Sequence, residues 1–229
     1  MSLKKKLDSI QKRIGFAQKR GGFDHPVQLI AVTKTRPFTT IQDCYRSQIT
    51  VIGENRIQEA AEKFRSFADM PGLVRRFIGH LQSNKAKLAA GRFHRIQSVD
   101  SVKLLRRLNV AMESREGLQR ILLQVNAGED PAKFGVCPEA AEALLEAGLS
   151  LPCIKIEGFM TIAPLSRDPE IARRAFARLR EIGDRLAERS GASLPELSMG
   201  MSADLEAAVI EGSTLLRVGS ALFGERVSH

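Results

Sequence analysis

The sequence lacks most of the residues that form base-stacking, redox and metal sites. It has no tryptophan and one tyrosine among 229 residues, so it offers no evident aromatic platform for nucleic-acid bases. Its three cysteines, Cys44, Cys137 and Cys153, are far apart and form no C-x-x-C motif, which suggests a reducing cytoplasm. The four histidines are scattered as well, so we expect no metal site.

Long apolar runs are absent too. None approaches the roughly 20 residues that a membrane-spanning helix needs. The basic segment Lys4–Lys6 is not followed by an apolar stretch, so the N-terminus does not resemble a secretory signal. We therefore expect a cytoplasmic protein without a membrane partner.

Positive charge is in excess, with 35 Lys and Arg against 26 Asp and Glu and a net charge of +9. This balance fits nucleic-acid binding, and it equally fits attraction of small anionic ligands. The positive residues are spread over expected helix faces, for example at Arg173, Arg174, Arg178 and Arg180. Solvated basic helix faces explain these residues better, so nucleic-acid binding remains a possible but poorly supported function.

Short apolar runs alternate with helical periodicity along the whole chain. Leu3, Leu7, Ile10 and Ile14 recur at helical spacing and predict an opening helix that ends near Gly21. Eight strand-like runs follow, at residues 29–34, 49–52, 77–79, 95–99, 121–125, 154–158, 196–199 and 215–219. Helices are expected between them, with apolar faces or start signals at residues 39–42, 57–68, 84–90, 101–114, 138, 175–186 and 204–211.

Eight strands that alternate with helices predict an α/β fold, a (β/α)8 TIM barrel with an extra N-terminal helix. No linker or low-complexity segment divides the chain, so residues 1–229 are expected to form a single domain. An open doubly wound sheet is the alternative, but no G-x-G-x-x-G follows the first strand to support it. Thr39–Gln42 is interpreted as a capping box that opens the helix after Pro37.

Lys34 follows the first apolar run, Leu29–Val32, and Pro37 ends the segment. We expect this lysine at the carboxyl end of a core strand, with its stem packed and its amine in a cleft. Partial burial disfavours the ammonium form and lowers a lysine's pKa, and such an amine can hold an aldehyde as a Schiff base. We hypothesise that Lys34 binds pyridoxal phosphate (PLP). An ordinary lysine that snorkels at a strand end is the alternative.

Unusual residues stand at the carboxyl ends of the predicted strands, where barrel enzymes place their chemistry. They are Lys34, Asn55, His80, Ser98, Asn126, Met160, the segment 198–202, Arg217, Gly219 and Ser220. Each also has a structural explanation: Asn55 can cap a helix, and Ser202 can be the cap before Asp204. Polar residues at the opposite end look scattered, so we expect one functional mouth.

The segment after the eighth strand predicts an anion site. Gly219 lets the backbone approach a ligand, and a helical turn that begins there would point free N–H groups at the mouth. Ser202 could add a hydroxyl. Arg217 alternates inward with Leu215, and an arginine inside a barrel is costly unless it meets an acceptor, which the ring nitrogen of PLP would provide. A tight turn near the C-terminus is the plainer alternative.

Seven segments carry a resemblance to a known family. They are AVTKTRP at 31–37, GENRIQE at 53–59, FIGHLQSNK at 77–85, QVN at 124–126, GFMTI at 158–162, LSMGMSAD at 197–204 and LRVGSALFG at 216–224. With these motifs in order over nearly the whole chain, the sequence resembles the pyridoxal-phosphate homeostasis protein family, formerly described as proline synthetase co-transcribed proteins. The combination is specific, whereas a lone T-K-x-R-P would be weak.

The resemblance implies a barrel similar to the PLP-binding domain of alanine racemases, with Lys34 as the Schiff-base lysine and Arg217 facing the pyridine nitrogen. It implies cytoplasmic control of PLP and amino-acid levels by a protein that is mostly described as a monomer. His80 has low weight, because family members vary there. The full set of cofactor-binding candidates is Lys34, Asn55, Met160, Ser198, Ser202, Arg217, Gly219 and Ser220.

Two functions compete for such a site: a PLP carrier or regulator that can serve apo PLP-dependent enzymes, and a PLP-dependent amino-acid racemase of weak activity. Racemisation by the alanine-racemase route needs a base on each face of the substrate carbon. Lys34 could be one of these bases. In alanine racemases the other base is a tyrosine from a partner subunit, and here the only tyrosine, Tyr45, is expected outside the barrel. An arginine at the ring nitrogen also weakens the ring as an electron sink. We therefore favour the carrier.

Overall fold

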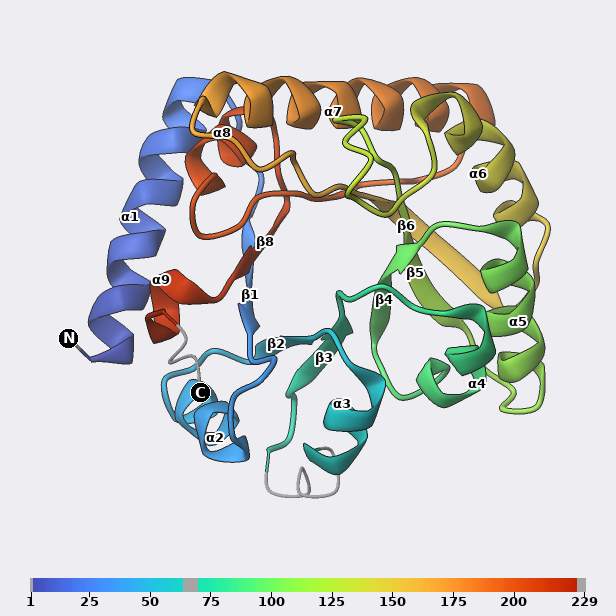
Figure 1. The fold of residues 1–229 in the computed structure, drawn as a ribbon, viewed down its shortest axis with the longest axis horizontal. Coiled ribbons are helices and arrows are strands. Elements are labelled where there is room, and N and C mark those ends of the chain that lie inside the picture. The colour runs from blue at the N-terminus through green and yellow to red at the C-terminus, as the bar shows by residue number, and fades with distance from the viewer. Residues whose placement is uncertain (1, 64–69, 226–229) are drawn as a thin grey trace.

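Eight parallel strands form a closed barrel in the order of the chain, which confirms the expected (β/α)8 fold (Figure 1). The computed structural model describes residues 2–63 and 70–225. The barrel closes where β1 pairs with β8, with Ile30 opposite Arg217. The strands are β1 (Gln28–Val32), β2 (Val51–Glu54), β3 (Val74–Phe77), β4 (Arg95–Val99), β5 (Gln119–Gln124), β6 (Ile154–Met160), β7 (Glu196–Ser198) and β8 (Leu215–Val218).

The helices surround this barrel in Figure 1. They are α1 (Leu3–Gly21), α2 (Phe38–Arg46), α3 (Ile57–Lys63), α4 (Ala86–Ala89), α5 (Val102–Glu113), α6 (Ala141–Leu149), α7 (Pro169–Ser190), α8 (Leu205–Ile210) and α9 (Ser220–Phe223). Short 3₁₀ turns precede α4 and α6. The opening helix ends as predicted, at Gly22 in the left-handed conformation, and α1 packs against α8 and α9. None of the helices in the described part of the chain is long and apolar enough to cross a bilayer.

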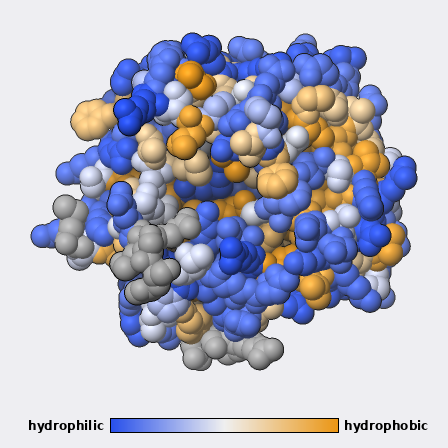
Figure 2. Space-filling view, viewed as in Figure 1, coloured by the Kyte–Doolittle hydropathy of each residue, from blue (hydrophilic) through white to orange (hydrophobic). Residues whose placement is uncertain are grey.

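The outer faces of α1 and α7 are mainly polar. Figure 2 shows hydrophilic residues over most of α1 and along α7, where several of the arginines lie. On α7, Arg173 pairs with Glu211, and Arg178 pairs with Glu129 and Glu139. Solvated, partly paired arginines on helix faces therefore account for this share of the positive charge.

One local expectation is wrong, and another can be checked only in part. The capping box at Thr39–Gln42 is wrong, because α2 begins at Phe38 and its N-cap is Pro37, which has no side-chain cap. Proline presets the extended backbone ahead of the helix, so the two threonines fall inside its first turn. The apolar face expected to continue to Phe64 and Ala68 lies partly outside the described residues.

Inside the barrel, apolar and polar side chains form separate layers. Five buried residues from different strands form one apolar cluster: Ile30, Val51, Leu122, Met160 and Leu215. Residues from β1 and from β5 can touch in a closed barrel only across its interior. The strands therefore direct these side chains inward, and the helices cover the outward-facing ones.

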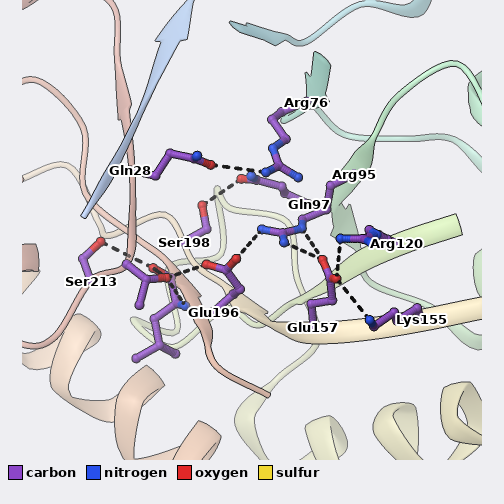
Figure 3. A network of polar contacts seen from close by, with 12 residues as sticks. Gln28, Arg76, Arg95, Gln97, Arg120, Lys155, Glu157, Glu196, Ser198 and Ser213 are labelled. Atoms are coloured by element: carbon purple, nitrogen blue, oxygen red, sulfur yellow. Dashed lines mark hydrogen bonds and ion pairs between the residues drawn. The ribbon is translucent and has the colours of Figure 1, made fainter. Parts of the chain in front are cut away.

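The polar residues at the opposite end are gathered into a network rather than scattered, contrary to expectation (Figure 3). Arg95 at the start of β4 donates to Glu157 at 2.6 Å and pairs with Glu196 at 2.9 Å. Arg76 donates to Gln28 at 3.2 Å, and burial together with the charge of Arg95 lowers the Arg76 pKa to about 10. These charged side chains come from β3, β4, β6 and β7, so they meet only when the barrel assembles.

Gly158 lies where β6 and β7 approach closely. It has a φ of 144°, and a Cβ there would clash with the backbone carbonyl of Glu196. We expect Gly158→Ala to lower the free energy of unfolding by about 2 kcal/mol or more, because both the strained φ and the clash oppose the native state. Urea denaturation measures this change.

Gly15 in α1 is the matched control, since nothing lies within 4 Å of a Cβ placed there. Gly15→Ala should raise stability by about 0.5–1 kcal/mol through helix propensity. Equal effects of the two substitutions would contradict the close strand approach at Gly158.

Candidate functional site

A cavity of about 710 Å³ opens at the carboxyl ends of the strands. This volume lies in the usual range for small-molecule sites. Six of the eight predicted site residues line it: Lys34, Asn55, Ser202, Arg217, Gly219 and Ser220. The other two, Met160 and Ser198, are fully buried and do not line it.

The turn that carries Lys34 is held by a buried ionic clamp. β1 ends at Val32, so Lys34 lies two residues beyond the strand rather than at its last position. The Lys63 ammonium of α3 donates to the carbonyl of Thr33 at 2.9 Å, to Glu54 at 2.8 Å and to Glu59 at 2.7 Å. One cation thus ties β1, β2 and α3 together directly beside Lys34.

The backbone of this turn is strained. Thr35 has a φ of 59°, which is a rare conformation for a β-branched residue. Its N–H donates to Glu59 at 2.5 Å, and the Thr33 hydroxyl donates to Glu54 at 2.6 Å. The carboxylates that face Lys63 therefore also hold the residues on both sides of Lys34. Sequence reasoning missed this clamp, although Glu59 and Lys63 have the i, i+4 spacing of a helix pair.

Arg217 lies inside the barrel as expected, but protein atoms already accept its hydrogen bonds. It donates to the Ser198 hydroxyl at 2.6 Å and to the Thr161 carbonyl at 2.8 Å. Burial lowers its pKa to about 10. Ser198 therefore positions Arg217 through this hydrogen bond. Met160 belongs to the apolar cluster inside the barrel.

Ser202 already occupies part of the predicted anion site. Its hydroxyl oxygen accepts from the N–H groups of Gly219 at 3.2 Å and Ala221 at 3.1 Å. The expectation that these N–H groups are free is therefore wrong for two of them. A hydroxyl whose oxygen accepts twice can still donate its own proton, so Ser202 presents a donor at the start of α9.

Two observations indicate that the cavity has space for a ligand and a polar atom without a hydrogen-bond partner. The Asn55 Oδ1 atom is buried without a hydrogen-bond partner in the described structure. Gly219 has a φ of −120°, which any residue adopts, and a Cβ there would meet only Val32, no closer than 3.5 Å. The protein itself does not need glycine at this point of the cavity wall.

Loops that follow the strands contribute further lining residues. His80 stacks on Phe134 with ring centroids 3.8 Å apart, and its Nδ1 atom lies 3.5 Å from Asp100. Arg36 extends over the Phe223 ring and donates to the carbonyl of Gly224 at 2.9 Å. Lining residues that sequence reasoning did not single out include Arg36, Phe134 and Ile162 in loops and Gln124 at the end of β5.

Two other residues at the mouth have structural roles. The Ser98 hydroxyl donates to the carbonyl of Gly79. Asn126 shapes the following loop through two hydrogen bonds to the backbone of Asp130. Neither lines the cavity.

Comparisons with known proteins give the class of this barrel. A family model described as alanine racemase, N-terminal domain, matches residues 6–227. An alanine racemase from Clostridium difficile has the same fold, with a TM-score of 0.74 and 14% identity over 95% of this chain and 60% of that one. The fold and the family model thus define an alanine-racemase-type barrel.

More similar relatives narrow the family. A pyridoxal phosphate homeostasis protein from Aquifex aeolicus is 38% identical over 99% of both chains, and one from Pseudomonas aeruginosa is 40% identical over 92% and 89%. The structure of PipY from Synechococcus elongatus with PLP bound has a TM-score of 0.86 and 36% identity, and covers 97% of this chain and all of that one. The chain belongs to the pyridoxal phosphate homeostasis protein family.

The clamp beside Lys34 makes a prediction about stability. Lys63→Met should lower the free energy of unfolding by about 3–5 kcal/mol at neutral pH, because Glu54 is left buried without its cation. Burial raises the pKa of Glu54, and a neutral acid needs no cation. The loss should therefore shrink as pH falls from neutral toward the ordinary value of 4.5. Urea denaturation at several pH values measures it.

The double variant Glu54→Gln/Lys63→Met should recover much of the stability. Lys87→Met, at an exposed lysine of α4, should change it by less than about 0.5 kcal/mol. A loss that does not depend on pH would contradict the role of Glu54.

Proposed function

We propose that this protein holds PLP covalently through Lys34 and acts as a carrier or regulator in intracellular PLP and amino-acid homeostasis. The observation that carries the proposal is that Lys34 lines the same cavity as the turn at Gly219 and Ser220 and the buried Arg217. The names of the relatives and the PLP-bound structure of PipY support it. In this proposal residues 1–229 act as one unit.

The residues of the cavity fit this cofactor. Gly219 leaves space at the wall, Ser202 and Ser220 offer hydroxyls beside it, and Asn55 keeps an unpaired buried oxygen. We assign Ser202, Gly219 and Ser220 to the phosphate and Arg217 to the ring nitrogen. Asn55 lies near the ring, Ser198 holds Arg217, and Met160 supports the floor.

When bound, PLP supplies an aldehyde that condenses with amines and a ring that can withdraw electrons. The protein's own contribution favours the first property. Arg217 is a buried cation whose hydrogen bonds to Ser198 and Thr161 fix its position. A fixed cation at the ring nitrogen discourages protonation there, so the ring is a weaker electron sink. Reversible storage of the aldehyde matches this arrangement better than carbanion chemistry.

The racemase alternative has little support in the described residues. Tyr45, the one tyrosine of the sequence, lies on α2 and packs against the cluster of Ile41, Ile52, Met70 and Leu73 outside the barrel. Its hydroxyl donates to the carbonyl of Pro71 at 2.9 Å. It does not line the cavity, so it cannot be the second base there.

We further propose that the carrier works in the cytoplasm, as a monomer, and that apo PLP-dependent enzymes are among its partners. The cysteine usage supports a reducing compartment.

Covalent capture tests the central claim. Protein incubated with PLP and reduced with borohydride should carry one label on Lys34, since the fixed turn presents this amine to the cavity. Lys34→Ala should lose the label, whereas Lys87→Ala, at an exposed lysine of α4, should keep it. Peptide mass spectrometry locates the site, and a label on a different lysine of the unsubstituted protein would reject the assignment.

Gly219 tests the phosphate site. Gly219→Ala should leave the free energy of unfolding nearly unchanged, because its Cβ meets only ordinary contacts. It should weaken PLP binding about tenfold or more, because the methyl group takes space from the phosphate. Pyridoxal, which lacks the phosphate, is the matched ligand, and its affinity should change much less. Equal losses for both ligands in an absorbance titration would place the phosphate elsewhere.

A further inference from the structure

His80 is oriented on two sides at the edge of the cavity. Its ring lies flat against Phe134, with ring centroids 3.8 Å apart and planes inclined by 10°. Its Nδ1 atom lies 3.5 Å from the Asp100 carboxylate. His80 follows β3 and Asp100 follows β4, so two adjacent strand ends bring the pair together. The Phe134 ring, itself half exposed, and the Asp100 carboxylate together orient the imidazole.

This orientation leaves one ring nitrogen for other partners. A neutral imidazole that donates from Nδ1 to a carboxylate keeps an unprotonated Nε2, which can accept a proton. His80 lines the same cavity as Lys34 and Asn55, and its side chain is 34% exposed. The amine that receives the cofactor must enter this same cavity.

We propose that His80 is the proton acceptor that allows an incoming amine to take PLP from Lys34. This inference rests on the proposed function and names the chemical class of the recipient, a primary amine such as an amino acid or an enzyme lysine. At neutral pH such an amine is a cationic ammonium group that cannot attack. General bases contribute typically about 10²–10⁴-fold to such steps.

The exchange balances without a further reactant. The ammonium group gives one proton to Nε2 of His80, and the resulting amine attacks the cofactor carbon that is bonded to Lys34. A carbon–nitrogen bond to the new amine forms as the bond to Lys34 breaks. One proton passes from the attacking nitrogen to the departing lysine nitrogen, and the proton on His80 returns to Lys34. No atom changes its oxidation state.

Charged groups of both signs surround His80. Asp100 stabilises the protonated imidazole, and burial raises the Asp100 pKa while the positive charge of His80 opposes this shift. Cations on the cavity wall repel the protonated imidazole of His80 and so favour return of its proton. The charged residues that line the cavity are Lys34, Arg36, Arg217 and Glu225.

Two amines of different basicity separate proton transfer from access. Glycine is an ammonium ion at neutral pH, whereas methoxyamine is already uncharged there. His80→Phe keeps an aromatic ring against Phe134 but cannot accept a proton. We expect His80→Phe to slow release of bound PLP to glycine about 10²-fold, and to leave release to methoxyamine within about twofold. Stopped-flow absorbance of the loaded protein measures both rates.

Equal slowing with both amines, or no slowing with glycine, would overturn the proposal. His25→Phe is the control, since His25 lies outside the cavity. The midpoint of the glycine pH profile should move to lower pH in Asp100→Asn, because the variant lacks the charge that stabilises the imidazolium. An unmoved midpoint would count against the pair.

A measurement without cofactor completes the test. Nitrogen NMR of the apo protein should show the neutral ring of His80 with its proton on Nδ1, and a proton on Nε2 would contradict the proposal. If the protein fails to bind PLP at all, the proposed function fails. Binding with a release rate that does not depend on His80 refutes only the present inference.

Discussion

The three hydrogen bonds from Lys63 are the interaction on which the site depends. They join the end of β1, the end of β2 and the first turns of α3 at one point, immediately beside Lys34. Without them, Glu54 would be an uncompensated buried charge, and Glu59, which accepts from the Thr35 N–H, would lose its cation. A buried ion pair contributes little net stability, because the two charges lose their hydration. The clamp is better understood as a device that fixes the position of one amine.

On the opposite wall of the cavity, polar groups also form hydrogen bonds within the protein. Ser202 accepts two N–H groups at the start of α9, and Ser198 and Thr161 accept from Arg217. Both groups therefore have protein partners when the cavity holds no ligand. Hydrogen bonds within the fold offset the desolvation of Arg217, so the proposed contact with a ligand would be an additional interaction that forms and breaks at little free-energy cost. A site of this kind suits reversible occupancy.

The barrel and most of its site were predictable because they follow from local patterns. Apolar runs that end at a polar or glycine residue predicted eight strands in the observed order, although the run at 77–79 overlaps β3 only at Phe77. Parallel strands bring Lys34, Asn55 and Arg217 to one mouth. The failures involve partners far apart in the chain. No local pattern pairs Glu54 with Lys63 across β2 and α3, or Arg95 with Glu196 across a hundred residues. Met160 and Ser198 were placed at the mouth because a one-residue shift along a strand decides between a wall and a floor.

A carrier of the proposed kind has two opposed requirements, and Asp100 and His80 bear on the second. The proposed covalent bond to Lys34 must last in the absence of a recipient, and it must break quickly when an amine arrives. A weak electron sink satisfies the first requirement, since it suppresses side reactions of the stored cofactor. It does nothing for the second, which needs proton transfer at the cavity. The imidazole between Phe134 and Asp100 is therefore positioned where the limiting step of a carrier, rather than that of a racemase, would occur.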